Sequence, residues 1–256
     1  MDWEHWDAAL FDLDGVLTPT TDLHRRAWAE MFGAFGREYG LPQPYTEADY
    51  FSEVDGKPRY DGVRSFLASR GVSLPEGAPD DPPDAMTVHG LGNAKQALFD
   101  AILARDGIEA YPGTVVLLDS LAGLDLPLAV VSSSRNAEAV LAAAGLADRF
   151  VFVMDGVVAG ERGLPGKPAP DTFLAAAAEV GATAATSVVI EDAVSGVAAG
   201  RAGDFGRVIG VDRGAGTDAL RAAGADLVVA DLADLVDRAD VVRSAGGAGP
   251  ARESRA

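Results

Sequence analysis

The chain has 256 residues, of which 48% are hydrophobic, and its 39 acidic residues outnumber 21 basic ones to give a net charge of −18. This length allows one large domain, or one domain with a sizeable insertion, to bury a full hydrophobic core. The negative charge argues against nucleic acid or an anionic membrane as the main partner, and the lack of cysteine excludes disulfides and thiolate metal sites and favours the cytoplasm.

The first predicted element is an apolar strand, Ala8–Phe11, which runs directly into Asp12-Leu13-Asp14-Gly15. Such a strand delivers two carboxylates to one edge of a sheet, where a nucleophile and its acid/base partner can face one substrate. Aspartate and glycine are also common in any turn that ends a strand. The motif alone therefore leaves a catalytic and a purely structural interpretation open.

Helical patterns dominate the next part of the chain. They cover His24–Tyr39, Tyr60–Arg70 and Leu91–Arg105, and a link rich in proline, aspartate and glycine at Leu74–Asp84 separates the last two. We expect residues 24–109 to form an all-helical cap inserted after the first strand, at the carboxyl ends of the strands where open α/β sheets bind ligands.

From residue 110 onward, short β-branched runs alternate with alanine-rich helical stretches. The predicted strands are Leu126–Val131, Phe150–Met154, Val188–Ile190, Val208–Val211 and Leu227–Val229, and the predicted helices are Ala137–Ala144, Thr172–Val180, Val194–Ala202 and Asp218–Ala223. Strands that are apolar on both faces indicate a parallel sheet between two layers of helices. The sequence thus predicts an α/β, Rossmann-like doubly wound core formed by residues 1–23 and 110–243, and a disordered tail at 244–256.

Three further polar motifs follow predicted strands or lie in loops at the same edge. They are Ser132-Ser133-Ser134-Arg135-Asn136, Lys167 between Gly166 and Pro168, and Glu191-Asp192. Each has an ordinary explanation: a serine N-cap, a solvated lysine, or acids that favour a helix N-terminus.

Because parallel strands bring their carboxyl ends together, we expect these motifs to share one site with the first. The carboxylates of Asp12, Asp192 and Glu191, together with the backbone carbonyl of Asp14, offer the oxygen ligands that Mg²⁺ prefers. Asp12 would attack a phosphoryl group whose charge magnesium and Lys167 offset.

With these four motifs in this order, the chain resembles the haloacid dehalogenase superfamily of phosphotransferases. The resemblance implies that Asp12 is the nucleophile and Asp14 the general acid/base. It also implies that Ser132 and Lys167 bind the transferring phosphoryl group and that the helical insertion is a mobile cap.

Within the superfamily the chain is most similar to the β-phosphoglucomutase-like subfamily, which interconverts β-glucose 1-phosphate and glucose 6-phosphate through an aspartyl-phosphate enzyme and a β-glucose 1,6-bisphosphate intermediate. Arginine suits the distal phosphate of such a bisphosphate because its fork binds phosphate bidentately. The chain departs from the subfamily pattern at Pro19 and Gly62 and in its enlarged cap around Leu74–Asp84. The matching substrate-binding positions are Thr20, His24, Gly56, Arg59, Lys95, Ser133, Ser134, Arg135 and Asn136.

Two other functions remain open on the sequence. A magnesium-dependent sugar-phosphate phosphatase would use the same core residues but let water attack the aspartyl phosphate. A catalytically silent interaction module would have no need for closely placed acids that repel one another. We expect a monomeric enzyme with a sugar phosphate as its partner, and neither a signal peptide nor a membrane helix is predicted.

Overall fold

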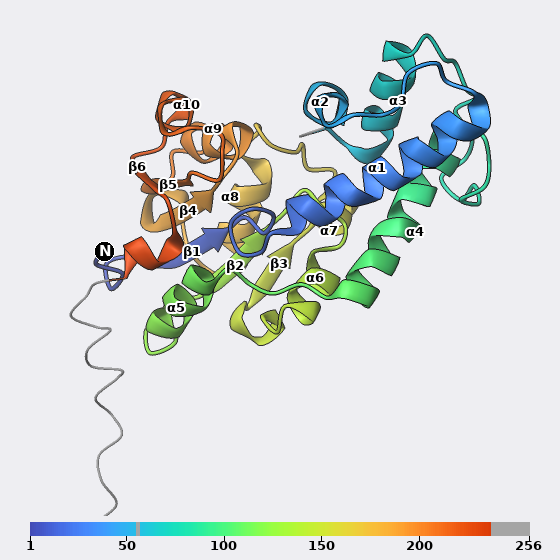
Figure 1. The fold of residues 1–256 in the computed structure, drawn as a ribbon. Helices are drawn as coiled ribbons and strands as arrows, with labels where there is room; N and C mark the ends of the chain where they lie inside the picture. Colours follow the sequence, from blue (N-terminus) through green and yellow to red (C-terminus); the bar gives the residue numbers. More distant parts are fainter. Residues whose placement is uncertain (55–56, 237–256) are drawn as a thin grey trace, which may run out of the picture. The chain divides into compact units, whose positions relative to one another are not determined.

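The computed structural model describes residues 1–54 and 57–236 and divides the chain into two compact units (Figure 1). The first unit comprises Met1–Thr18 and the chain from Ala110 onward, and the second is Pro19–Glu109. Residues 19–23, assigned to the core by the sequence analysis, group with the second unit because the first helix already begins at Thr20. The expected tail at 244–256 lies outside the described residues.

The first unit is built on a parallel sheet of six strands in the order β3-β2-β1-β4-β5-β6. The residues of β1 and β4 are all buried, as expected for central strands with a helical layer on each side. This confirms the predicted α/β fold class. The strands are β1 (Ala8–Phe11), β2 (Leu128–Val131), β3 (Phe152–Met154), β4 (Ser187–Glu191), β5 (Arg207–Val211) and β6 (Leu227–Val229).

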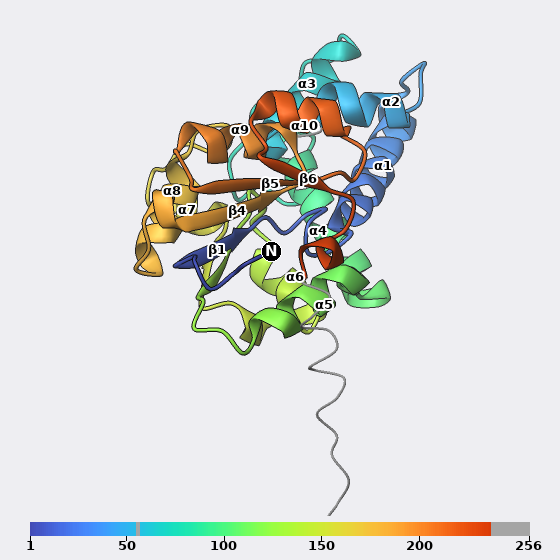
Figure 2. The same ribbon diagram turned by 90° about the vertical axis from the view of Figure 1, so that its left-hand side faces the viewer.

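Helices cover both faces of this sheet, with α8, α9 and α10 on one face and α5 and α6 on the other (Figures 1 and 2). On the first face, Leu10 of β1 and Val189 of β4 pack with Phe173 of α8 and Val197 of α9. The helices are α5 (Pro112–Leu121), α6 (Ala137–Ala143), α7 (Gly156–Glu161), α8 (Asp171–Glu179), α9 (Val194–Ala202) and α10 (Thr217–Ala223), with 3₁₀ turns at Ala147–Arg149, Ala184–Thr186 and Leu232–Leu235.

The strand register brings the carboxyl ends of β1, β2 and β4 to one edge of the sheet. Phe11 pairs with Val130 on one side and with Ile190 on the other. The ladder continues one residue further, because the Asp12 amide donates to the Ile190 carbonyl at 2.9 Å. The backbone of Asp12, the first polar residue after β1, is therefore held by a sheet hydrogen bond.

All regular secondary structure in the described part of the second unit is helical. Its core contains a cluster of aromatic rings. The ring centroid of Phe32 lies 5.2 Å from that of Trp28 and 3.9 Å from that of Phe66. The elements are α1 (Thr20–Tyr39), α2 (Glu47–Asp49), a π-helical turn at Tyr50–Val54, α3 (Arg59–Ser69) and α4 (Val88–Asp106). Among the helices of residues 1–54 and 57–236, none is long and apolar enough to cross a bilayer.

Candidate active site

A buried lysine joins two carboxylates at the carboxyl edge of the sheet. Lys167 Nζ lies 2.5 Å from Asp12 Oδ1 and 2.7 Å from Glu191 Oε1, and it also donates to the Val131 carbonyl at 2.9 Å. The second Glu191 oxygen accepts from the Ala193 amide at 2.7 Å. Three segments far apart in the sequence thus meet here, and the lysine has a fixed direction.

Burial and the neighbouring charges both shift the pKa values of these groups. Burial would lower the pKa of Lys167, but the carboxylates of Asp12 and Glu191 raise it well above its usual range. Burial raises the pKa of Asp12 well above its usual value, and Lys167 only partly offsets this because Glu191, Asp14 and Asp192 add repulsion. Burial and the neighbouring Glu191 raise the pKa of Asp192 to about 8. Without a bound cation, these raised pKa values favour the protonated, neutral forms of Asp12 and Asp192.

The turn after Asp12 brings the second acid of the first motif to the same edge. Asp14 Oδ2 accepts from Ser132 Oγ at 3.3 Å, and that hydroxyl oxygen accepts from the Ser134 amide at 3.0 Å. Gly15 has a left-handed φ of +86°, and a Cβ at this position would lie 2.0 Å from Asp192 Oδ2. Glycine is required here on both counts, since a side chain would be strained and would displace the Asp192 carboxylate.

The serine-rich motif forms the loop between β2 and α6. Ser132 is buried, Ser134 and Asn136 are half-buried, and Ser133 and Arg135 are exposed. Ser134 Oγ accepts from the Asn136 amide at 3.2 Å, which fixes the loop locally. The motif therefore places one hydroxyl, that of Ser132, beside the Asp14 carboxylate and follows it with half-buried and exposed polar side chains.

Within the second unit, two predicted substrate-binding residues lie together. Lys95 Nζ lies 2.7 Å from His24 Nδ1, and the His24 ring stacks on Phe99 with a centroid distance of 4.4 Å. Lys95 is only 4% exposed and lies over the rings of Trp28 and Phe99 at 5.4 and 4.9 Å. Thr20 is fully buried in the first turn of α1.

Arg59 is the first residue of α3 and is half-buried. Its guanidinium donates to Gln96 Oε1 at 2.8 Å and to the Tyr60 hydroxyl at 3.2 Å. Gly56, the other predicted residue of this loop, lies outside the described residues. The Lys95–His24 pair and Arg59 belong to the second unit, whereas the carboxylate cluster belongs to the first.

The donor chemistry of the cluster fits a hard divalent cation, although the described residues include no ready-made set of three metal-binding side chains. Carboxylate oxygens are the ligands that Mg²⁺ prefers. A bound cation would offset the burial and the carboxylate repulsion that together raise the pKa values of Asp12 and Asp192. Both oxygens of Glu191 are already engaged, by Lys167 and by the Ala193 amide.

Sequence reasoning missed one residue that supports the turn after Asp12. Arg213 Nε donates to the Gly15 carbonyl at 3.2 Å, and its guanidinium lies 4.0 Å over the Tyr111 ring. Arg213 also pairs with Asp231 at 3.4 Å. Its position two residues after the end of β5 at Val211 was the available signal, because other strands of this sheet carry site residues at the same edge.

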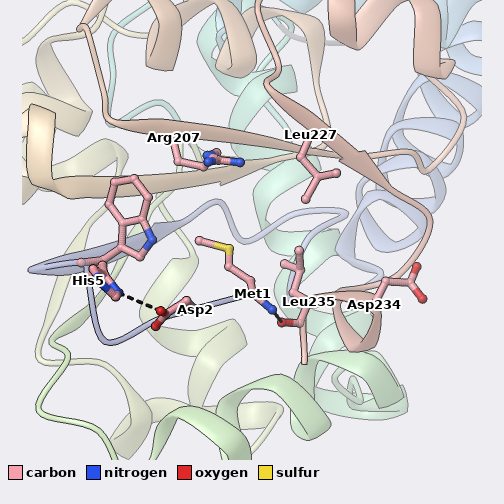
Figure 3. Close-up of a pocket in the computed structure, with 8 residues that line it drawn as sticks. Met1, Asp2, His5, Arg207, Leu227, Asp234 and Leu235 are labelled. Atoms are coloured by element: carbon pink, nitrogen blue, oxygen red, sulfur yellow. Dashed lines mark hydrogen bonds and ion pairs between the residues drawn. The ribbon is translucent and has the colours of Figure 1, made fainter. Parts of the chain in front are cut away.

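A cavity of about 580 Å³ lies at the opposite, amino-terminal ends of β5 and β6 (Figure 3). Arg207 and Leu227, which begin these two strands, line it together with Met1 and Leu235. The Met1 amino group donates to the Leu235 carbonyl at 3.1 Å. None of the carboxylates of the cluster described above lines this cavity.

Comparison with known proteins agrees with this geometry. A family model described as haloacid dehalogenase-like hydrolase matches residues 6–204. A beta-phosphoglucomutase of Mycobacterium bovis is 49% identical over 241 residues, which cover 90% of this chain and 91% of the relative. The chain belongs to the haloacid dehalogenase-like hydrolase family. The resemblance drawn from the four motifs is thereby confirmed, and the chain is a phosphotransferase enzyme.

Two further relatives of this family member bear on its fold and specificity. The fructose-1-phosphate phosphatase YqaB of Escherichia coli is 30% identical over 200 residues, covering 78% of this chain and 94% of the relative. The crystal structure of a beta-phosphoglucomutase from Clostridium difficile superposes with a TM-score of 0.72 at 22% identity, covering 93% of this chain and 96% of that one. At that identity, the structural likeness supports the fold alone.

Proposed function

We propose that this enzyme is a β-phosphoglucomutase that interconverts β-glucose 1-phosphate and glucose 6-phosphate. The observation that carries the proposal is the buried carboxylate of Asp12, held 2.5 Å from Lys167 beside Asp14 at the carboxyl edge of the sheet. The 49% identity to a beta-phosphoglucomutase over most of both chains favours a mutase among the phosphotransfer reactions that this cluster can perform.

In the proposed reaction, a carboxylate oxygen of Asp12 attacks a phosphorus atom of β-glucose 1,6-bisphosphate. The bond from phosphorus to the sugar oxygen breaks, and Asp14 protonates that oxygen as it leaves. The aspartyl phosphate then transfers its phosphoryl group to the hydroxyl of an incoming sugar monophosphate, whose proton returns to Asp14. Regenerating the bisphosphate in this way leaves the primer unconsumed.

Charge neutralisation is the second part of the proposed mechanism. Lys167, oriented by Glu191, offsets the negative charge of the phosphoryl group, and the Ser132 hydroxyl donates to it. We propose that Asp12, Asp14 and Asp192 hold Mg²⁺. Glu191, predicted as a further ligand, is left out of this set because both of its oxygens already accept hydrogen bonds. The bound magnesium would act as a Lewis acid on the phosphoryl oxygens.

A mutase must also hold the phosphate that does not react. We propose that the second unit is a cap that excludes water from the aspartyl phosphate, and that Arg59 grips the distal phosphate. Lys95 and His24 would contact the sugar, together with Thr20 and Gly56. Ser133, Ser134, Arg135 and Asn136 of the core would complete this subsite. A guanidinium stays charged and binds phosphate bidentately, which suits Arg59 and Arg135 to this task.

The second candidate is a sugar-phosphate phosphatase, and the 30% identity to a fructose-1-phosphate phosphatase is the observation that favours it. The two functions share every step up to the aspartyl phosphate and differ in what attacks it next. A phosphatase admits water, whereas a mutase admits only a second sugar phosphate.

We also propose a monomeric, cytoplasmic enzyme. Size-exclusion chromatography with light scattering would test the oligomeric state, and fractionation of the source cells would test the location.

The deciding experiment supplies β-glucose 1-phosphate, Mg²⁺ and a trace of β-glucose 1,6-bisphosphate, and measures glucose 6-phosphate and orthophosphate together. A mutase forms glucose 6-phosphate in step with substrate loss and releases almost no orthophosphate. Orthophosphate without the isomer would establish the phosphatase instead. Neither product across a panel of sugar phosphates would contradict both candidates.

A further inference from the structure

Arg59 is held in place by hydrogen bonds that lie entirely within the second unit. Besides donating to Gln96 and to the Tyr60 hydroxyl, its guanidinium lies 5.0 Å over the Tyr60 ring. Both acceptors are neutral, and the two bonds use two of the five N–H donors of a guanidinium. Within the described part of the chain, three donors of Arg59 thus remain for an anion.

Each of these two acceptors is itself fixed by a further contact. Gln96 Nε2 donates to Asp100 Oδ1 at 2.8 Å, and the Tyr60 hydroxyl donates to Asn93 Oδ1 at 3.0 Å. A Cβ at Gly92 would lie 2.6 Å from the Tyr60 ring. Glycine inside α4 weakens that helix, but here it gives the ring the room it needs.

Asn93 connects this network to the segment that enlarges the cap, Leu74–Asp84. Its Nδ2 atom donates to the carbonyl of Pro79 at 3.0 Å and to that of Asp81 at 2.8 Å. The segment is fastened again where the Asp81 carboxylate accepts from the Thr87 hydroxyl at 2.6 Å. A continuous path of hydrogen bonds therefore runs from the enlarged segment to the arginine.

We infer that Tyr60 and Asn93 are positioning residues for Arg59, and that the segment Leu74–Asp84 acts through them to strengthen the grip on the distal phosphate of a sugar bisphosphate. The inference rests on the proposed function, because it requires Arg59 to bind that phosphate. An arginine held in place before binding loses less side-chain freedom when the phosphate arrives. A small phosphate ester has no distal phosphate and does not sense the network.

The test compares two reactions of the full-length enzyme with Mg²⁺: the mutase reaction, for the KM of β-glucose 1,6-bisphosphate, and hydrolysis of p-nitrophenyl phosphate. For Tyr60→Phe and for Asn93→Ala we expect this KM to rise roughly fivefold, which is the effect of losing one ordinary hydrogen bond. The rate of p-nitrophenyl phosphate hydrolysis should be unchanged in both variants. Tyr45→Phe is the matched control, because the buried Tyr45 hydroxyl has no hydrogen-bond partner among residues 1–54 and 57–236. This control should leave both reactions unchanged.

A double-mutant cycle separates positioning from a general structural role. In an Arg59→Ala background, Tyr60→Phe should raise the KM no further. An equal rise in both backgrounds, or a Tyr60→Phe enzyme that behaves like Tyr45→Phe, would overturn the inference while the proposed function stands. If Arg59→Ala lowers mutase activity and p-nitrophenyl phosphate hydrolysis equally, the distal-phosphate role itself fails, and the inference fails with it.

Discussion

The crowded carboxylates predict that the metal-free enzyme loses stability as the pH rises. Burial and the neighbouring Glu191 raise the pKa of Asp192 from 3.8 to about 8, whereas in the unfolded chain this carboxyl ionises near pH 4. Between about pH 4 and pH 8 the unfolded state therefore releases a proton that the folded state keeps. The free energy of unfolding falls across this window, and Asp192 contributes no slope below or above it.

The size of this effect follows from the rise in the pKa of Asp192. From 3.8 to about 8 it corresponds to ~6 kcal/mol, at about 1.4 kcal/mol per pKa unit. This is the upper limit for the loss across the whole window, and it is comparable to the total stability of roughly 5 to 15 kcal/mol of a typical protein. Magnesium at about a hundred times its Kd would return ~2.7 kcal/mol by binding only the folded state.

The assay is urea denaturation in EDTA at several values between about pH 5 and pH 8, repeated with Mg²⁺. Asp192→Asn should reduce the slope of stability against pH by up to about 1.4 kcal/mol per pH unit. Asp125→Asn removes an exposed acid of the same unit and should keep the wild-type slope. Stability that stays flat or rises with pH in EDTA would refute the reasoning, as would an unchanged slope in Asp192→Asn.

Three further substitutions test individual contacts. Asp12→Asn should abolish turnover because it removes the proposed nucleophile. The urea midpoint should stay at or above that of the wild type, because the change removes a buried charge at nearly constant volume. Residual mutase activity would overturn the nucleophile assignment. Lys167→Met should cost about 3 to 5 kcal/mol of unfolding free energy at neutral pH, because it leaves buried carboxylates without their cation; denaturation showing a loss below about 1 kcal/mol would contradict this. Gly15→Ala should lower turnover at least about tenfold, since its Cβ would lie 2.0 Å from Asp192 Oδ2. Gly163→Ala, at another positive φ but with open space around it, is the matched control and should keep wild-type turnover.

The sheet, and the strand ends at which the acidic motifs meet, were predictable because their sequence signals are local. The strand at Ala8–Phe11 and the acids after it occur in one short run, and parallel pairing then determines which strand ends meet. Lys167 was predicted for the same site, but its contact with both Asp12 and Glu191 depends on packing between distant segments. The helix α5 was missed because its run from Pro112 to Leu121 is apolar almost throughout and lacks the alternation that marks a helix with one exposed face.

The hydrogen-bond network of the second unit could not be predicted from the sequence. The link at Leu74–Asp84 was expected only to enlarge the cap, from its proline, aspartate and glycine content. Its contact with Asn93 through the carbonyls of Pro79 and Asp81 is made by backbone atoms, which leave no trace in residue identity. Tyr60 was likewise seen only as the start of a helix, because nothing local indicates that its hydroxyl joins Arg59 to Asn93.

The central claim is that Asp12 itself receives the phosphoryl group, and peptide mass spectrometry of the acid-quenched enzyme tests it most directly. The enzyme is mixed with β-glucose 1,6-bisphosphate and Mg²⁺, quenched in acid within one turnover, and digested to locate the modified residue. The account predicts a mass increase of one phosphoryl group on the peptide that contains Asp12, and no such increase in Asp12→Asn. A phosphoryl group on another residue, or an unmodified wild-type enzyme during turnover, would contradict it.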